Sequence, residues 1–375
     1  MKINKLLFTI IFSLIGVISA MAAQGYAVYT SSNATLTFYY GTPPAAGAYI
    51  LNEGLERPGW YGAGIYSQVS RVVFDPSFAQ ARPTTTAYWF YEMKNLSSIV
   101  GLNYLRTDEV VKMRFMFGYC EKLTSLDVSK FNTSKVTDFI GMFYSCRGLT
   151  SIDVSHFNTS QGTDMSSMFS CCSGLTSLDL SRFNTGNVTN MKMMFADCSS
   201  LSALSLRSFN TSKVTSMFHM FYLCENLVNL DLASFNTSNV TDMRSMFEYC
   251  ESLITITVGK KWTTAGVTPE NSEYMFGNCF SIRGGSGTVF NPNFIDKTYA
   301  HIDFGRTNPG YLTDAHIVPG DVSGDDKVNV TDVTTLINMI LGVVPVDFAR
   351  ADINGDGKVN VSDVTVLINL ILGAN

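Results

Sequence analysis

Apolar positions recur along the middle of the chain at an interval of 26 residues. Cysteine and leucine both keep this interval without slippage through six successive units. These positions are Cys120, Cys146, Cys172, Cys198, Cys224 and Cys250, and Leu123, Leu149, Leu175, Leu201, Leu227 and Leu253. A fixed period of this length is typical of stacked repeats, because a unit this small cannot bury its apolar face alone. The pattern therefore predicts one continuous core that runs through neighbouring units.

Each unit changes its periodicity halfway along. Leu175, Leu178 and Leu180 face one side between polar residues, as in a half-buried strand. Beyond a Phe-Asn-Thr turn, apolar residues from 188 to 198 follow at helical spacing, with Thr189 as the expected helix N-cap. We therefore predict an α/β repeat solenoid with a parallel sheet on one face and short helices on the other. We expect the asparagines of the turns to form an internal ladder that satisfies turn backbones, at Asn132, Asn158, Asn184, Asn210 and Asn236.

The unit also carries two signatures, Phe-Asn-Thr-Ser-x-Val-Thr and Met-Phe-x-x-Cys, which recur five or six times. In these signatures the chain resembles the BspA-like leucine-rich-repeat surface proteins, over roughly residues 26–313. The resemblance implies a leucine-rich-repeat solenoid that serves surface display, adhesion or scaffolding. It also implies an N-terminal cap of β-hairpins, from residues 27–29 to 37–40, and a C-terminal cap that reaches residue 311.

Two acidic segments of twelve residues close the chain, at 321–332 and at 352–363. Both place oxygen-bearing side chains at positions 1, 3, 5, 9 and 12. This alternation suits Ca²⁺, which takes oxygen ligands and accepts a backbone carbonyl at position 7 of such loops. Position 6, where such loops turn sharply, is Gly357 in the second loop but Asp326 in the first. The predicted ligands of two Ca²⁺ ions are Asp321, Ser323, Asp325, Lys327, Asn329 and Asp332, and Asp352, Asn354, Asp356, Lys358, Asn360 and Asp363.

An amphipathic helix is predicted after each loop, and no helix is expected before either one. The apolar stripe of the first helix comprises Val333, Leu336, Ile337, Ile340 and Leu341, and it recurs 31 residues later. Gly342 and Gly373 are the expected helix ends. This duplication, with Asp rather than Glu at position 12, resembles the type I dockerin module over residues 319–375. The resemblance implies a small all-α, calcium-binding domain that docks to a cohesin domain of a scaffold protein.

In dockerins the surface that contacts cohesin centres on loop positions 10 and 11 and helix positions 17 and 18. Here these positions hold Val330, Thr331, Ile337 and Asn338 in the first copy, and Val361, Ser362, Ile368 and Asn369 in the second. Valine replaces a polar residue at position 10 and the usual basic pair is missing, which predicts a more apolar interface. The isoleucines also belong to the helical stripe, so the core is the alternative location for them. Because the two copies are nearly equal, either helix is expected to dock.

The remaining segments complete the expected domain organisation. Lys2, Lys5, the apolar run at 6–18 and Ala20-Met21-Ala22 are typical of a secretory signal peptide. The apolar run is too short for a membrane span, and no cysteine for a lipid anchor lies near the cleavage site. We expect a secreted or cell-surface protein. The predicted segments are a signal peptide (1–22), a β-rich cap (23–86), the repeat array (87–290), a C-terminal cap (291–313), a linker (314–320) and the dockerin-like domain (321–375).

Eight cysteines in an exported chain raise the question of disulfides. Seven of them occupy one repeat position, so their side chains are expected to point the same way. Parallel side chains fit a disulfide bond poorly, because the dihedral angle about its S–S bond is near 90°. We therefore favour buried free thiols, with disulfides as the alternative. Cys171, which precedes Cys172 outside the repeat position, is expected to be the most exposed.

The charged residues add little chemistry outside the acidic loops. The whole net charge of −5 lies in residues 319–375, so neither part has the basic bias that nucleic-acid binding requires. One column of the predicted sheet holds Asp127, Asp153, Asp179 and Asp231. We interpret these carboxylates as solvated groups that bond neighbouring turns, with a cation or ligand groove as the alternative.

Candidate catalytic residues are not evident in the sequence. The four histidines share no motif with a nucleophile or a metal ligand, and the glycine-rich segment at 284–287 lacks the flanking strand and helix of a phosphate loop. We expect a non-catalytic exported protein whose array binds an unknown ligand or surface and whose dockerin module joins a cohesin-bearing, polysaccharide-degrading assembly. The first alternative is a free-standing adhesin with a purely structural calcium module. A less favoured alternative is a hydrolase accessory of a glycoside hydrolase system.

Overall fold

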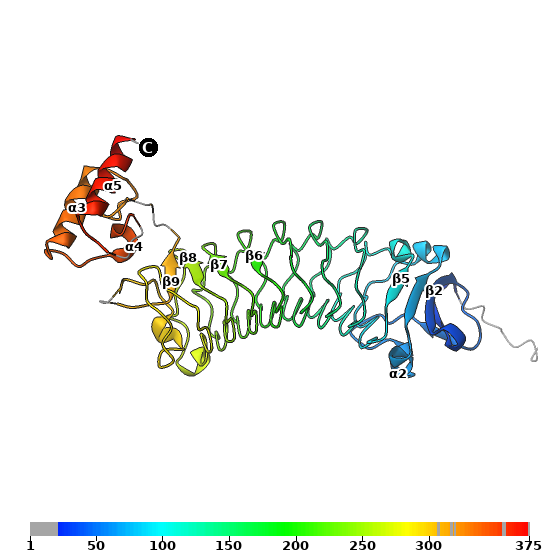
Figure 1. Ribbon diagram of the computed structural model, residues 1–375. Helices are drawn as coiled ribbons and strands as arrows, with labels where there is room; N and C mark the ends of the chain where they lie inside the picture. The colour runs from blue at the N-terminus through cyan, green and yellow to red at the C-terminus, as the bar shows by residue number, and fades with distance from the viewer. Residues whose placement is uncertain (1–21, 306–307, 316–317, 319, 355–357, 374–375) are drawn as a thin grey trace, which may run out of the picture.

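The computed structural model describes residues 22–305, 308–315, 318, 320–354 and 358–373. Figure 1 shows an elongated stack of coils with the C-terminal helices gathered at one end. The expected signal peptide lies, apart from its last residue, outside the described residues. Within the described ranges, no helix has the length and apolar character needed to cross a membrane.

A mixed five-stranded sheet begins the stack, with the strand order β3-β1-β2-β4-β5. Its strands are β1 (Gln24–Thr30), β2 (Thr35–Gly41), β3 (Ala48–Ile50), β4 (Arg71–Phe74) and β5 (Ser98–Val100). The strands β1 and β2 form the expected antiparallel hairpin, whereas β4 pairs in parallel with both β2 and β5. The sheet therefore passes from the antiparallel cap into the parallel order of the repeats. Short helical turns connect these strands: η1 (Ser31–Asn33), α2 (Gly59–Gly62), η2 (Ile65–Ser67), η3 (Pro76–Gln80) and η4 (Leu102–Tyr104).

An aromatic cluster holds this cap on the first coil. The buried ring of Phe38 stacks on Phe74 at 4.7 Å and on Trp89 at 5.3 Å, between ring centroids. The indole nitrogen of Trp60 donates a hydrogen bond of 2.8 Å to the carbonyl of Trp89. Trp89 lies at the start of the predicted array (87–290), so these contacts close one end of the apolar core.

The repeats stack in register at the 26-residue interval. Isolated parallel bridges join equivalent residues of successive coils, through Thr85, Lys112, Asp138, Asp164, Asn190, Ser216 and Asp242. The phenylalanines of the Met-Phe signature are buried and stack from coil to coil, with centroids 5.6 Å apart for Phe143 and Phe169 and 6.1 Å apart for Phe169 and Phe195. Side chains of the same kind thus form continuous columns inside the array.

The short helices predicted for the second face are wrong. No α-helix lies between residues 84 and 286, all of which the structure describes. Instead this face turns through left-handed residues such as Phe115 (φ 48°) and Tyr119 (φ 62°), which cannot continue a right-handed helix. The amide of Phe115 donates to the carbonyl of Ile140 at 2.8 Å, in the next coil, rather than within its own turn. Thr189, the predicted N-cap, likewise donates its amide to the carbonyl of Thr163 in the preceding coil.

Besides the parallel pairing of β4 with β5 at the N-terminal end, a regular parallel sheet is described at the C-terminal end of the array. Its strands are β6 (Ala203–Ser205), β7 (Asn229–Leu232), β8 (Thr255–Val258) and β9 (Leu312–Asp314), in this order. Equivalent residues of the earlier coils, such as 177–179, have no strand assignment. The prediction of a parallel sheet along one whole face is therefore correct in part. The leucine-rich-repeat assignment remains a prediction.

The internal ladder consists of threonines and not of the predicted asparagines. The threonine of each Phe-Asn-Thr turn is buried, at Thr133, Thr159, Thr185, Thr211 and Thr237, and so is Thr107 at the equivalent position of the preceding coil. The hydroxyl of Thr185 donates to the carbonyl of Asn210 at 2.9 Å and accepts from its amide at 2.8 Å. The side chain of Asn184 is exposed and accepts the amide of Gly186. Threonine lies inside because its methyl group packs in the core while its single hydroxyl satisfies both groups of the next turn.

All eight cysteines are free, as expected, and seven of them are buried. Each buried thiol donates to a phenylalanine carbonyl of the preceding coil; the sulfur of Cys172, for example, lies 3.0 Å from the carbonyl oxygen of Phe143. Burial raises the pKa of Cys172 and of Cys224 to about 12, which disfavours the reactive thiolate. Cys171 is partly exposed.

The aspartate column has the turn-bonding role that the sequence favoured. One carboxylate oxygen of Asp127, Asp153 and Asp179 accepts the amide of the serine two residues later, at 2.9, 3.0 and 2.9 Å. These serine hydrogen bonds lower the pKa of the three carboxyl groups. Each of these carboxylates therefore stabilises its own turn. This role explains the column without a cation-binding groove.

A buried carboxylate organises the segment that closes the array. Asp303 is 1% exposed and accepts hydrogen bonds from the amides of Ser286, Thr288 and Gly305 and from the hydroxyl of Thr288. The glycine-rich segment at 284–287 therefore wraps a carboxylate. A β-carbon at Gly284 would lie 2.1 Å from the carbonyl oxygen of residue 310, so close backbone approach requires glycine there. Two further turns, η5 (Glu270–Ser272) and η6 (Lys297–Tyr299), complete this end.

The C-terminal module consists of α3 (Val330–Ile340), α4 (Phe348–Ala351) and α5 (Val361–Leu372). Helix α3 packs against α5 over a small core of Val322, Leu336, Met339, Ala351 and Leu367. As predicted, Gly342 and Gly373 follow the ends of α3 and α5, and they have φ values of 73° and 65°. The expectation that no helix precedes the second loop is wrong, because α4 ends directly before Asp352.

We predict that the threonine ladder contributes more stability than the exposed asparagines. Thr185→Val keeps the side-chain volume but leaves the amide and carbonyl of Asn210 without their hydroxyl partner, which should cost about 1–3 kcal/mol. Asn184→Ala is the matched control and should cost less, because water can replace its exposed side chain. Denaturant unfolding measures both variants. An equal or larger loss for Asn184→Ala would contradict the ladder.

We also predict free thiols throughout the array. Alkylation of the native chain should label Cys171 first, since the other thiols are buried and poorly ionised. Alkylation after unfolding without reductant, followed by mass spectrometry, should label most of the eight cysteines. Labelling of fewer than half of them would indicate disulfides instead.

Candidate calcium loops and docking surface

The first acidic loop brings three carboxylates together. One oxygen from each of Asp321, Asp325 and Asp332 lies within 4.8 Å of the others. Asp321 and Asp332 are buried, whereas Asp325 is exposed to solvent. Oxygen ligands lie about 2.3–2.6 Å from Ca²⁺, so atoms at this separation can share one ion. The all-oxygen donor set and its convergence therefore fit a calcium ion.

The backbone of the loop is folded around Asp321. One of its carboxylate oxygens accepts the amides of Gly324 and Asp325 at 2.8 and 3.0 Å, and the other accepts the amide of Asp326 at 3.1 Å. Asp326 has a left-handed φ of 64°, a conformation that Asp tolerates better than most residues. This explains how the first loop turns at position 6 without the glycine of the second loop.

The closing residue of the first loop is also part of α3. One oxygen of Asp332 accepts the amide of Ser323 at 2.8 Å and the other accepts the amide of Asn329 at 2.7 Å. Asn329 is the N-cap, and its side chain accepts the amide of Thr331 at 2.7 Å. Burial of Asp332 acts to raise its pKa, but the backbone hydrogen bonds outweigh burial and lower it. Because α3 starts inside the loop, Asp332 both closes the loop and holds the first turn of the helix.

The second loop repeats these contacts 31 residues later. One oxygen of Asp363 accepts the amides of Ile353 and Asn354 at 3.0 and 3.3 Å, and the other accepts the amide of Asn360 at 2.9 Å. Asn360 is the N-cap of α5 and accepts the amide of Ser362 at 2.8 Å. Two matching loop-to-helix junctions thus support a duplicated site.

The predicted ligands differ in how the structure places them. Asp321, Asp325 and Asp332 converge, and Ser323 lies beside them with its hydroxyl 3.4 Å from a carboxylate oxygen of Asp321. The side-chain oxygens of Asn329 and Asn360 bond helix amides, so their part in binding a metal remains a prediction. So does the part of Asp352, Asn354 and the carbonyls of Lys327 and Lys358. Asp356 and Gly357 lie outside the described residues.

The predicted docking residues lie on the surface of the two helices. Val330 and Ile337 of α3 are 71% and 41% exposed, and Val361 and Ile368 of α5 are 69% and 41% exposed. Thr331, Ser362 and Asn369 are exposed as well, and Asn338 is partly exposed. Of the two locations considered for the isoleucines, the docking surface and the core, the structure therefore shows the surface.

The predicted core stripe of each helix is consequently too wide. In α3, Leu336 is buried and Val333 and Ile340 are partly buried against the core, whereas Ile337 and Leu341 are exposed. Helix α3 packs on α5, so only one narrow side of it is covered in this module. The uncovered side of each helix presents a second apolar row, which we call the docking stripe. The docking stripes consist of Val330, Thr334, Ile337 and Leu341 on α3, and of Val361, Thr365, Ile368 and Leu372 on α5.

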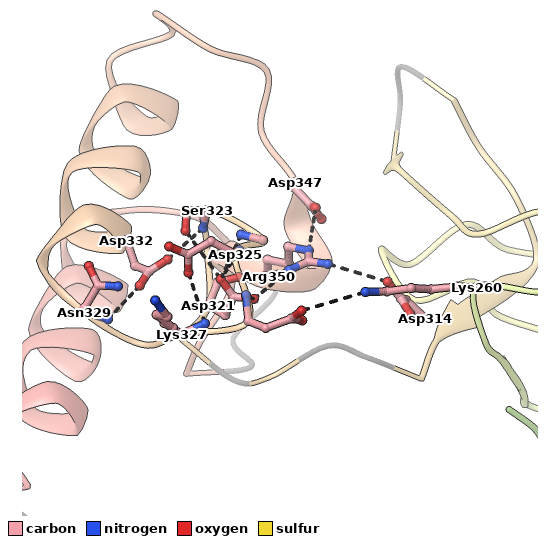
Figure 2. A network of polar contacts seen from close by, with 12 residues as sticks. Lys260, Asp314, Asp321, Ser323, Asp325, Lys327, Asn329, Asp332, Asp347 and Arg350 are labelled. Atoms are coloured by element: carbon pink, nitrogen blue, oxygen red, sulfur yellow. Dashed lines mark hydrogen bonds and ion pairs between the residues drawn. The ribbon is translucent and has the colours of Figure 1, made fainter.

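Sequence reasoning missed Arg350, although its side chain contacts a predicted metal ligand. Its guanidinium group lies 3.2 Å from a carboxylate oxygen of Asp321 (Figure 2). The available signal was its position two residues before the second loop, in a segment with only three basic residues. Local spacing could not show that Arg350 reaches back to the first loop.

Two parts of the chain match known protein families. Residues 84–203 and 163–286 match the family described as Mycoplasma protein of unknown function, DUF285. Residues 319–372 match the dockerin type I domain. No curated protein matches the chain.

We predict that Asp325 contributes to calcium binding while its neighbour Asp326 does not. Asp325→Ala should weaken or remove calcium binding at the first loop, because it removes one of three convergent carboxylates. Asp326→Asn removes the adjacent exposed charge and should leave binding close to that of the unchanged chain. Calcium titration by calorimetry distinguishes the two variants. Equal effects would show that loop charge, rather than the convergent set, determines affinity.

Proposed function

Because the chain belongs to the DUF285 family through residues 84–286 and ends in a type I dockerin domain, we propose that it is a non-catalytic exported docking protein. Its C-terminal module binds a cohesin domain of a scaffold protein, and its repeat array, a leucine-rich-repeat solenoid, binds a ligand or a surface. The setting that the dockerin domain suggests is a polysaccharide-degrading assembly outside the cell or at its surface. A signal peptide over residues 1–22 directs the chain there.

The docking stripes are the observation that carries this proposal. Each stripe repeats the other 31 residues away, with 71% and 69% exposure at its first valine and 41% exposure at both isoleucines. Full burial of an exposed Val or Ile side chain contributes about 1.5–3 kcal/mol, and these partly exposed side chains gain a share of it in proportion to the area that a partner covers. The equivalence of the two stripes supports docking by either helix, with the module turned about half a revolution between the two modes.

Calcium supports docking through the junctions between loops and helices. Asp332 and Asp363 each close a calcium loop and occupy the third position of a helix that carries a docking stripe. Without metal, the carboxylates of each loop repel one another and the helix starts lose their fixed positions. We propose two bound Ca²⁺ ions, one for each loop, and docking that requires them.

A free-standing adhesin is the second candidate, and a specific contact favours it. Arg350 of the calcium module lies 3.5 Å from Asp314 at the end of the array, so the module also stabilises the array's end. In that case calcium would serve structure alone, and the docking stripes would have no partner. Binding of a cohesin in calcium, and its loss in chelator, favours the docking protein over the adhesin.

We predict that docking tolerates the loss of one stripe but not of both. Val330→Asp should leave cohesin binding largely intact because α5 can still dock, whereas Val330→Asp with Val361→Asp should abolish it. Val343→Asp is the matched control, since Val343 is 69% exposed but lies outside both stripes. A pull-down with a panel of cohesin domains in calcium measures these variants.

The outcomes separate the parts of the proposal. Complete loss from either single valine substitution would exclude docking by both helices. Loss caused by Val343→Asp would move the interface away from the stripes. Failure of every cohesin to bind the unchanged chain would favour the adhesin.

A further inference from the structure

The calcium module contacts the end of the repeat array through charged side chains (Figure 2). Arg350, in α4, lies among three carboxylates: 3.2 Å from Asp321, 3.5 Å from Asp314 and 3.5 Å from Asp347, between nitrogen and oxygen atoms. Asp314 ends β9, the last strand of the array's sheet, and Asp321 begins the first calcium loop. One guanidinium group therefore connects the array to a predicted metal ligand.

These contacts are partly shielded from solvent. The side chains of Arg350 and Asp314 are 19% and 16% exposed, and that of Asp321 is fully buried. The guanidinium group also donates to the main-chain carbonyl of Asp321 at 3.2 Å. Charge-assisted hydrogen bonds in such surroundings are screened less than surface ion pairs. Another ion pair between the two parts joins Lys260 and Asp326 at 3.8 Å; these side chains are 70% and 65% exposed, so the pair should contribute less.

The second calcium loop approaches the array as well. Asp352, its first residue, lines a cleft of about 640 Å³ together with residues 283–289 of the array's closing segment. Both loops thus lie near the junction, and the first loop contributes Asp321 and Asp326 to ion pairs there. Metal binding at the first loop and the position of the module can therefore influence each other.

We propose that Arg350 latches the calcium module to the end of the array, and that calcium at the first loop closes this latch. The three carboxylates of that loop converge within 4.8 Å, and Asp321 belongs both to this cluster and to the contact with Arg350. Without a divalent cation, their mutual repulsion opens the loop and moves Asp321 away from Arg350. With calcium, Asp321 is held where Arg350 can bind it together with Asp314.

The latch fixes the orientation of the docking stripes relative to the array and leaves the stripes exposed. Val330 and Val361 remain 71% and 69% exposed while Arg350 contacts the array. Calcium then does more than order the docking helices: it fixes how the array is presented relative to the scaffold. This inference rests on calcium binding at the first loop but not on the identity of any cohesin.

Thermodynamic linkage gives the latch a second signature. If calcium favours the latched arrangement, then the latched arrangement must raise calcium affinity by the same factor. Asp314, which the sequence assigned to the linker, is the last residue of β9 in the array's sheet and is separated from the first loop by residues 315–320. A substitution at Asp314 that weakens calcium binding would therefore report coupling through Arg350.

Small-angle X-ray scattering of the full chain tests the latch. In calcium, the unchanged chain should give a narrow distribution of distances, and chelator should broaden it and increase the maximum dimension. Arg350→Gln and Asp314→Asn should give the broad distribution even in calcium. Lys261→Gln removes an exposed positive charge from the end of the array, outside the latch and the calcium loops, and should behave like the unchanged chain. Circular dichroism in calcium should show that the helices of all variants are intact.

Calcium titration of the same proteins completes the test. Asp314→Asn should weaken calcium binding at the first loop by roughly five-fold or more. A narrow distribution for Arg350→Gln or Asp314→Asn would overturn the latch, and tighter calcium binding by Arg350→Gln would mean that Arg350 competes with the ion. Absence of calcium binding by the unchanged chain would instead overturn the calcium sites themselves, which separates the two failures.

Discussion

The whole array depends on backbone hydrogen bonds that pass from one coil to the next. The amide of Phe143 donates to the carbonyl of Met168, that of Phe169 to Met194 and that of Phe195 to Met220, each about one repeat further along. A coil therefore cannot satisfy its own backbone or bury its own leucines. The 26-residue period follows from this constraint, because a coil of another length would misplace every column of side chains. The first and last coils lack a neighbour on one side. The aromatic cluster around Phe38 closes one end of the array, and the segment around the buried carboxylate of Asp303 closes the other.

The C-terminal module is built on a different constraint. Its buried apolar core consists of Val322, Leu336, Met339, Ala351 and Leu367, which is small for an independent domain. Carboxylates occupy the positions that organise it: Asp332 and Asp363 hold the helix starts, and Asp321 holds the first loop. Metal binding can supply the folding free energy that such a core lacks. Stacked neighbours stabilise the array, whereas we propose that a cation stabilises the module.

The sequence predicted the features that depend on local spacing. The repeat period, the hairpin of the cap, the free cysteines and the two acidic loops with their helices all follow from residues close together or evenly spaced. The short helices were wrong because apolar residues three and four apart also suit a corner that turns through left-handed residues such as Phe115 and Tyr119. The sequence could not show which side chain of a turn, asparagine or threonine, points into the core, because the neighbouring coil determines this. In the structure Thr185 is buried and Asn184 is exposed. Arg350 was missed for the same reason, since its partners Asp314 and Asp321 are distant in sequence.

Hydrogen exchange of the full chain, in calcium and in chelator, tests the central claim that the two parts obey separate constraints. The account predicts that amides bonded to the next coil, such as those of Phe143 and Phe169, stay protected in both conditions. Amides of α3 and α5 should lose protection in chelator, because the loops that hold their first turns open. Loss of protection throughout the array on removal of calcium, or unchanged protection of α3 and α5, would contradict it.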